Sequence, residues 1–336
     1  MKIILSRKGF DSSYGGYPSP ILPDGSLVSL PIPSMRYLDE DNKNSRKLYA
    51  FDGSPYELIT YQDLNLPTET RTYLRSKGVP FTTYKDLMLQ LLPKDRIKEP
   101  MAGKSKWFEK EVPWCCHLDP DLVFDVIERE KGWRPLFGQT GAAQAHLRKQ
   151  EVGREDIFLF FGWFRKTKII TSEGEAQLVY DPVDPHGRHV IFGYFQVDEV
   201  LTAGDEGKVK PWMRTHPHIE KGLWESNNNA LYVARKHLSW DSGLDGAGVF
   251  AFRKDLVLTE TNPIHNPKQN RSIWKYSFLP EGTDITYHND KSWVRETTEK
   301  GKVRKYFQSA SRGQEFVISK RASLEKKVKN WIFEEK

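Results

Sequence analysis

The sequence predicts an α+β fold in which helices flank a mixed or antiparallel sheet that curls towards a barrel. Runs rich in aromatic and β-branched residues, bounded by Gly, Pro and Asp, are typical of strands. They cover residues 156–165, 176–181, 189–201, 230–236 and 248–259. The 336 residues include 38% hydrophobic residues, with 10 Trp, 14 Tyr and 18 Phe, which is enough for a folded core.

The first part of the chain is predicted to mix short strands with helices. An apolar strand over the first five residues stops at Ser6, and a loop rich in Gly, Ser, Pro and Tyr leads to a short strand at 26–30. Ser54 lies in a capping-box pattern, with Pro55 at the first helical position and Glu57 three residues after the cap. We therefore expect a helix to begin at Ser54.

Helical spacing recurs further along the chain. The other predicted helices cover residues 83–92, 119–129 and 140–150. Pro93 ends the first of these, Asp119 is the expected N-cap of the second with Pro120 after it, and Thr140 is the expected cap of the third.

Shifts in composition divide the chain into three segments, or mark subdivisions of one integrated domain. Polar stretches at 39–47 and 94–113 are predicted to be exposed loops. The segments are an N-terminal α+β part at 1–113, a β-rich part at 114–290 and a basic C-terminal part at 291–336.

Net charge is moderately basic. The chain carries 51 Lys and Arg against 45 Asp and Glu, a formal charge of +6. This excess leans towards the C-terminus and is compatible with nucleic acid without requiring it, and a solvated surface is the favoured explanation.

Location is predicted from cysteine usage and from apolar run lengths. Cys115 and Cys116 are adjacent, and because a disulfide between neighbours is strained, we expect two reduced thiols. The longest apolar run, "DIFLFFGWF", is strand-sized, and no secretion signal is recognisable at the N-terminus. We expect a cytoplasmic protein without a membrane partner.

The stretch "SRKGFDSSYGG" at 6–16 is the first candidate site. Arg7 and Lys8 follow a strand, and a glycine-rich loop backed by cations can hold phosphate. Asp11 is the nearest carboxylate for proton transfer. The stretch is neither a Walker loop nor a dinucleotide-binding fingerprint, and a surface turn is the alternative.

The stretch "WCCHLDPD" is the second candidate. In an extended segment, His117 and Asp119 share a face, so their side chains could act on one ligand or proton. His117 could equally be a metal ligand or a buried histidine bonded to backbone, and Asp119 could serve as a helix cap alone.

The stretch "GQTGAAQAHL" is the third candidate. Gln139 and Gln144 flank a predicted helix start, where free N–H groups suit phosphate or carboxylate. Close helix packing through Gly and Ala is the alternative.

A base-binding pocket is the last candidate. Within residues 210–234, aromatic rings could stack on a planar base and amides could read its edge. The pocket would be formed by Trp212, His216, Trp224 and Asn228. The same residue types also serve ordinary cores and turns.

Metal binding is not predicted. The histidine pairs at 186 and 189 and at 216 and 218 lack the partner spacing of known zinc or iron sites. The sequence leaves the cofactor undetermined.

Several of these phrases resemble one family. "SRKGFDSSYGGYPSPILPDG", "HLDPDL", "FGQTGAAQAHL" and "DIFLFFGWFR", in this order, resemble the nucleotide modification associated domain 3 family over roughly residues 1–260. The resemblance implies bacterial or phage proteins tied to nucleic-acid modification by gene neighbourhood. Matching the motifs points to Arg7, Lys8, Asp11, His117, Asp119, Gln139 and Gln144 without assigning their roles.

Residues 153–259 also look like PUA-like barrels of the EVE and ASCH kind, in the order of their strands. Such barrels bind RNA or a flipped modified base, although long loops at 166–188 and 202–229 depart from the compact pattern. A likeness of fold does not by itself establish function.

These observations leave three alternative functions. The first is an enzyme in which Arg7 and Lys8 hold phosphate while Asp11, His117 or Asp119 moves protons. The second is a non-catalytic reader of modified bases in DNA or RNA. The third is an assembly protein with protein partners in a modification or defence system. A nucleotide or nucleic acid is the expected ligand.

Overall fold

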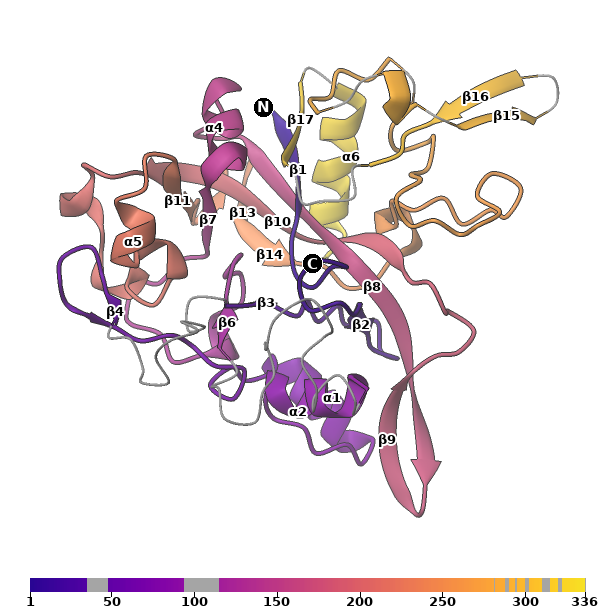
Figure 1. The fold of residues 1–336 in the computed structure, drawn as a ribbon, viewed down its shortest axis with the longest axis horizontal. Helices are drawn as coiled ribbons and strands as arrows, with labels where there is room; N and C mark the ends of the chain where they lie inside the picture. Colours follow the sequence, from indigo (N-terminus) through magenta and orange to yellow (C-terminus); the bar gives the residue numbers. More distant parts are fainter. Residues whose placement is uncertain are drawn as a thin grey trace, which may run out of the picture.

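A nine-stranded mixed sheet forms the centre of the protein (Figure 1). The computed structural model describes residues 1–34, 48–93, 115–280, 282–287, 290–293, 295–299, 302–309, 315–319 and 322–335. The main path of the sheet runs in the order β17, β1, β8, β10, β11, β7, with β2 and β9 on β8 and β14 on β10. Its strands are β1 (Ile3–Arg7), β2 (Ser19–Ile21), β7 (Leu136–Thr140), β8 (Ile157–Ser172), β9 (Glu175–Tyr180), β10 (Arg188–Leu201), β11 (Asn229–Ala234), β14 (Ala247–Val249) and β17 (Glu315–Ile318).

Strand β1 occupies an interior position in this sheet. It pairs parallel with β8 and antiparallel with β17. All five residues of β8 from Ile157 to Phe161 are fully buried, which explains why this part of the sequence is apolar at every position rather than at alternate ones.

The sheet curls so that its two ends approach each other. Gln139 on β7 donates a hydrogen bond to Glu315 on β17, although these strands are at opposite ends of the path. Inside the curl, the ring centroid of Phe137 lies 4.8–6.4 Å from those of Phe158, Phe160, Phe195 and Tyr232. Among the described residues no ladder joins β7 to β17, so the sheet is curled but is not a closed barrel.

Helices and small two-stranded sheets surround the central sheet. In Figure 1, α1 and α2 lie near β9 at one end of the molecule, and α6 lies at the other. The helices are α1 (Thr68–Ser76), α2 (Tyr84–Leu91), α4 (Gly141–Lys149), α5 (Lys221–Trp224) and α6 (Ala322–Phe333). The small sheets pair β3 (Ile32–Pro33) with β6 (Cys116–His117), β4 (Leu48–Tyr49) with β5 (Pro55–Tyr56), β12 (His237–Leu238) with β13 (Asp241–Asp245) and β15 (Arg295–Glu299) with β16 (Lys302–Tyr306). Short 3₁₀ turns cover Phe124–Val126, Glu206–Lys208, Pro211–Met213, Pro217–Ile219, Lys254–Leu256 and Asp290–Ser292.

Several sequence predictions are confirmed. The fold is α+β, and α2 begins with a complete capping box between Thr83 and Asp86. Helix α4 follows Thr140, although the hydroxyl of this residue makes no capping hydrogen bond. Cys115 and Cys116 are buried free thiols. In the described part of the chain, no helix is long and apolar enough to cross a membrane.

The predicted helix at 119–129 is wrong. The backbone of Asp121 pairs with Leu136 in both directions, at 2.8 and 3.0 Å, so this segment runs extended beside β7. The Asp121 carboxylate also receives two hydrogen bonds from the guanidinium of Arg129, which holds the later part of the segment in a loop. Only the 3₁₀ turn Phe124–Val126 is helical, and Asp119 is not a helix cap.

Three smaller predictions also need correction. The residues after Ser54 form β5 rather than a helix, because Asp52 accepts the Ser54 N–H and hydroxyl and closes a turn. The expected strand at 26–30 is reduced to isolated bridges at Ser26 and Leu27. The strand at 248–259 is confined to β14.

The predictions for 39–47 and 94–113 lie outside the described residues. The division into three segments stays a prediction. Each of the three segments contributes to the same sheet, for example through β1, β8 and β17.

His189 on β10 is a buried polar residue within the core. Its Nδ1 accepts a hydrogen bond from Trp274 Nε1 at 3.1 Å, so this nitrogen carries no proton. Burial, together with the charges of Arg7 and Arg271, lowers the pKa of His189 well below its usual value. The imidazole is therefore neutral in the folded protein.

We predict that this neutral imidazole makes the fold sensitive to acid. Below about pH 6.5 the unfolded chain binds a proton that folded His189 does not bind, so the free energy of unfolding falls by about 1.4 kcal/mol per pH unit for this group. His189→Gln should remove this contribution, and chemical denaturation between pH 5 and 8 measures it. An unchanged dependence in the variant would contradict the assignment.

Candidate functional site

Lys8 and Asp119 form an ion pair within a polar cluster that is largely buried. Lys8 follows β1, and its backbone N–H donates to the carbonyl of Phe161 on β8 at 2.9 Å. Its Nζ lies 3.1 Å from Asp119 Oδ2 and 4.3 Å from the ring centroid of Phe137. The side chains of Lys8 and Asp119 are only 12% and 3% exposed, so solvent screens this pair weakly.

Arg7 points to the opposite side of the strand from Lys8, as adjacent strand residues do. Its guanidinium donates to Ser309 at 3.3 Å and lies 5.6 Å from the ring of Phe161. Burial lowers the pKa of Arg7 to about 10, and the charge of Arg271 adds to this, while that of Asp11 opposes it. The two cations of the predicted phosphate-binding stretch are therefore divided between two faces.

Asp119 is held in place by the neighbouring strand. Its Oδ1 accepts the backbone N–H of Gly138 on β7 at 2.7 Å, because the 119–121 segment runs alongside that strand. Burial raises the pKa of Asp119, but the charge of Lys8 and the contacts with His216 and His218 outweigh it and hold the pKa well below its usual value. Asp119 is therefore ionised.

Two buried histidines lie on the other side of this carboxylate. His216 Nδ1 accepts the backbone N–H of His218 at 3.3 Å, so the proton of His216 is on Nε2, 3.5 Å from Asp119 Oδ1. His218 Nδ1 lies 2.7 Å from the side-chain oxygen of Asn229. Burial lowers the pKa of His218 well below its usual value.

Glu315 extends the cluster towards β17. Its Oε1 accepts the hydroxyl of Ser6 at 3.0 Å and the side-chain amide of Gln139. Burial raises the pKa of Glu315, and the charge of Lys8 and these two hydrogen bonds oppose the shift. Ser6, Gln139 and Glu315 thus join β1, β7 and β17 across the seam of the curled sheet.

Two residues predicted for the site have structural contacts elsewhere. Asp11 accepts the backbone N–H groups of Ser13 and Tyr14 at 2.6 and 2.8 Å, which closes its own turn. Gln144 accepts the hydroxyl of Tyr232 at 2.9 Å within the core.

Of the four residues predicted for a base pocket, Trp212 and Trp224 share one apolar cluster, and His216 and Asn228 have contacts elsewhere. Trp224 is buried, donates its Nε1–H to Glu206 at 2.9 Å and has its ring 5.2 Å from that of Phe51. Trp212 packs at the edge of the same apolar cluster. The carbonyl of Asn228 accepts the N–H of Gly141, whereas His216 contacts Asp119.

Three residues of the cluster are not predicted as site residues from the sequence. His218 was noted only as one of a histidine pair, and Asn229 is the neighbour of the predicted Asn228. Glu315 lies more than 300 residues from Ser6, and only the strand pairing brings them together.

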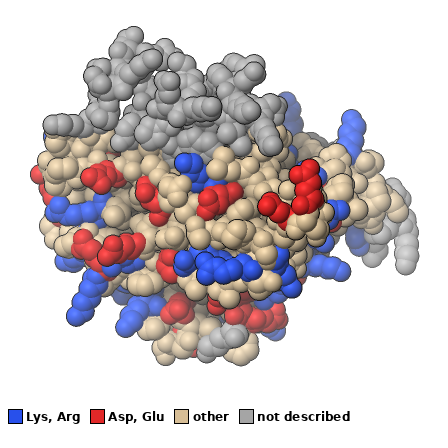
Figure 2. Space-filling model, turned by 90° about the horizontal axis from the view of Figure 1, so that it is seen from below, with Lys and Arg blue, Asp and Glu red and all other residues tan. Residues whose placement is uncertain are grey.

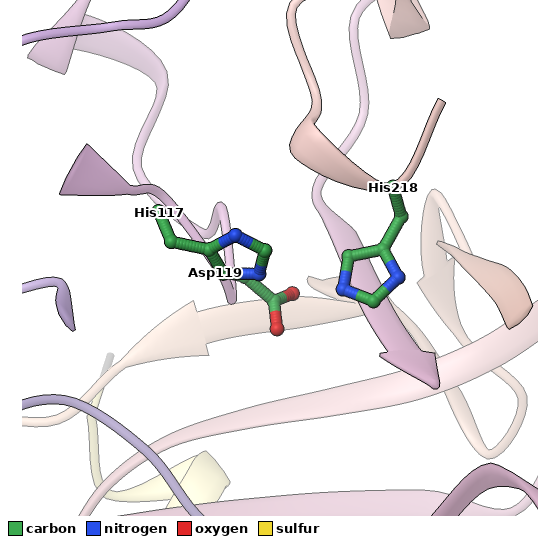
Figure 3. A group of neighbouring side chains, drawn as sticks. All are labelled: His117, Asp119 and His218. Atoms are coloured by element: carbon green, nitrogen blue, oxygen red, sulfur yellow. The ribbon is translucent and has the colours of Figure 1, made fainter. Parts of the chain in front are cut away.

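Three side chains of the cluster could hold a metal ion (Figure 3). The ligand atoms of His117, Asp119 and His218 all lie within 4.8 Å of one another. They come from β6, from the loop after it and from the 3₁₀ turn Pro217–Ile219.

Comparison with known proteins gives one family. A sequence model of the family described as nucleotide modification associated domain 3 matches residues 2–319. No curated protein and no solved structure matches the chain.

We predict that Lys8 and Asp119 depend strongly on each other for stability. Asp119→Asn or Lys8→Met should each lower the free energy of unfolding by about 3–5 kcal/mol, because each leaves a buried charge without its partner. The double variant should lose clearly less than the sum of the two. Urea denaturation of the four proteins measures the coupling.

The partly exposed pair of Lys168 and Asp181, 3.6 Å apart, provides the matched control. Lys168→Met should lower the free energy of unfolding by less than about 1 kcal/mol. Additive losses at Lys8 and Asp119 would contradict the strong coupling.

Proposed function

Because this chain belongs to the nucleotide modification associated domain 3 family, its role is associated with nucleotide modification, and we propose that it binds a phosphate-bearing nucleotide or nucleic acid beside the Lys8–Asp119 pair. We further propose that it acts there as an enzyme of group transfer or base modification. In this proposal Lys8 attracts the anionic ligand, and Asp119 and the neighbouring histidines accept and donate protons during the reaction.

One observation carries this proposal. The phrases "SRKGFD", "HLDPD" and "GQT" lie far apart in the sequence but meet at one carboxylate. Lys8 from the first phrase and Gly138, which opens the third, both donate hydrogen bonds to Asp119 of the second. Burying charged groups costs free energy, and local turns do not require it. Buried clusters of charged groups are frequent at functional sites, which supports a role in binding or catalysis.

The cluster has a partly exposed rim over a buried interior. Lys8, His117 and Gln139 are partly exposed, whereas Asp119 and Glu315 are buried. A ligand would therefore meet an ammonium, an imidazole and an amide first. These groups suit the phosphate and the base edge of a nucleotide.

An apolar pocket adjoins the cluster on another side of Asp119. Its wall includes Gly9, Tyr84, Asp119 and Leu122. Its cavity volume is about 60 Å³, well below the roughly 300–1,000 Å³ of small-molecule sites, so a planar base would enter only if the lining side chains moved apart.

The reader alternative has less support. The Trp224 side chain is buried in the core. The backbone carbonyl of Asn228 accepts a hydrogen bond from Gly141 at the start of α4. On the face shown in Figure 2, acidic and basic side chains are interspersed rather than gathered in one basic stripe. A reader that follows nucleic-acid phosphates depends on such a stripe.

The ligand can be identified without prior assumptions. Mass spectrometry of small molecules and nucleic acid that copurify with the full chain should detect a nucleotide or an oligonucleotide. Recovery of the same species from a Lys8→Met, Asp119→Asn double variant would contradict binding at this cluster.

We predict that Gln139→Ala weakens nucleotide binding by about tenfold, because one hydrogen bond to a charged group is worth about 1.5 kcal/mol or more. The measurement is calorimetric titration with deoxynucleoside monophosphates and triphosphates and with short single-stranded DNA and RNA. Gln177→Ala, at a partly exposed position on β9, is the control and should bind as the unmodified chain does. Equal affinity of both variants would argue against the proposed site.

A further inference from the structure

We propose that His117, Asp119 and His218 bind one divalent transition-metal ion, of the Zn²⁺ or Fe²⁺ kind. Two imidazole nitrogens and one carboxylate oxygen form a donor set of intermediate softness, which these ions accept. The proposal stands on the geometry of the cluster and does not depend on the proposed function.

The ligand atoms are almost in place. Those of the three side chains lie within 4.8 Å of one another, and around a tetrahedral ion with bonds of about 2.0–2.1 Å they would lie about 3.3 Å apart. Figure 3 shows the rings of His117 and His218 on either side of the Asp119 carboxylate. Small side-chain movements would complete the site.

The protonation of His218 is fixed in the form that a metal requires. The side-chain amide nitrogen of Asn229 donates to the carbonyl of His218 at 3.0 Å, so the amide oxygen of Asn229 faces His218 Nδ1 at 2.7 Å. An oxygen can only accept, and His218 Nδ1 must therefore carry the proton. Its Nε2, on the side of the ring facing Asp119 in Figure 3, keeps a bare lone pair. Metal-binding histidines are usually oriented by such a second hydrogen bond.

Asp119 retains the capacity to bind an ion. Its Oδ1 accepts the N–H of Gly138 and faces the Nε2–H of His216, which together fix the carboxylate plane. Among the described residues, Oδ2 accepts one hydrogen bond, from Lys8. A carboxylate oxygen has two lone pairs, so one remains for a metal.

His117 completes the site from its rim. It belongs to the short strand β6, where Ile32 of β3 is its partner, and its ring centroid lies 5.2 Å from that of His218. Because His117 is only partly buried, an ion held here would have a side open to a ligand. Three protein ligands with an open position are typical of catalytic rather than structural metal sites. A bound ion would polarise a phosphate or carbonyl oxygen, or activate a water molecule.

Lys8 opposes metal binding in part. Its ammonium shares the Asp119 carboxylate with the proposed ion, and two cations on one carboxylate repel each other. Lys8→Met should consequently tighten metal binding rather than weaken it, the opposite of its effect on an anionic ligand.

The test is metal titration of the full chain, prepared without a histidine tag and stripped with a chelator. Zn²⁺ binding by calorimetry and Co²⁺ binding by visible absorption should show one ion per chain. His117→Ala should weaken binding at least tenfold. Asn229→Ala, which frees the ring of His218, should weaken it by about 10–100-fold.

The matched control is His237→Ala. His237 has a carboxylate neighbour, Asp245, at 3.8 Å but lies outside the cluster, so its removal should leave metal affinity unchanged. Circular dichroism establishes that each variant is folded, and His117→Gln replaces His117→Ala if the latter is not. Absence of stoichiometric binding, or equal affinities of the His117, Asn229 and His237 variants, would overturn the proposal.

Discussion

The buried ion pair between Lys8 and Asp119 is the constraint on which the arrangement of the site depends. Burying two charges is unfavourable unless each is well paired and hydrogen-bonded. Lys8 is positioned by the pairing of its backbone with β8, and Asp119 by the N–H of Gly138 on β7. The pair can form only when the N-terminal strand, the segment after β6 and β7 are all in their native positions. Displacement of any one of these elements would leave a buried charge without its partner in a medium of low dielectric constant.

The curl of the sheet explains why polar groups collect there. The ends of the sheet meet without a backbone ladder among the described residues, and the hydrogen bond from Gln139 to Glu315 links them instead. Behind this seam the aromatic cluster around Phe137 provides an apolar wall, and the ring of Phe137 lies against the Lys8 ammonium. A seam of this kind brings polar side chains from several strands together on a rigid scaffold, which is a favourable setting for a binding site.

Local patterns in the sequence were sufficient for elements whose stability is local. The capping box of α2 and the long aromatic strands could be predicted because their signals lie within a few residues. The segment 119–129 could not, since the pairing of Asp121 with Leu136 and the bonds from Arg129 override its helical spacing. At the site, Lys8, His117 and Asp119 were identified from their own phrases. Glu315 and Asn229 act only through tertiary contacts, which no spacing in one sequence reveals.

A crystal structure of the full chain with a bound nucleoside phosphate tests the central claim most directly. The account predicts that the phosphate or the base lies within hydrogen-bonding distance of Lys8, His117 or Gln139, at the seam where β7 and β17 meet. A nucleotide bound instead at the polar pocket formed by Arg134, Arg235 and neighbouring residues, with the Lys8–Asp119 cluster untouched, would contradict it.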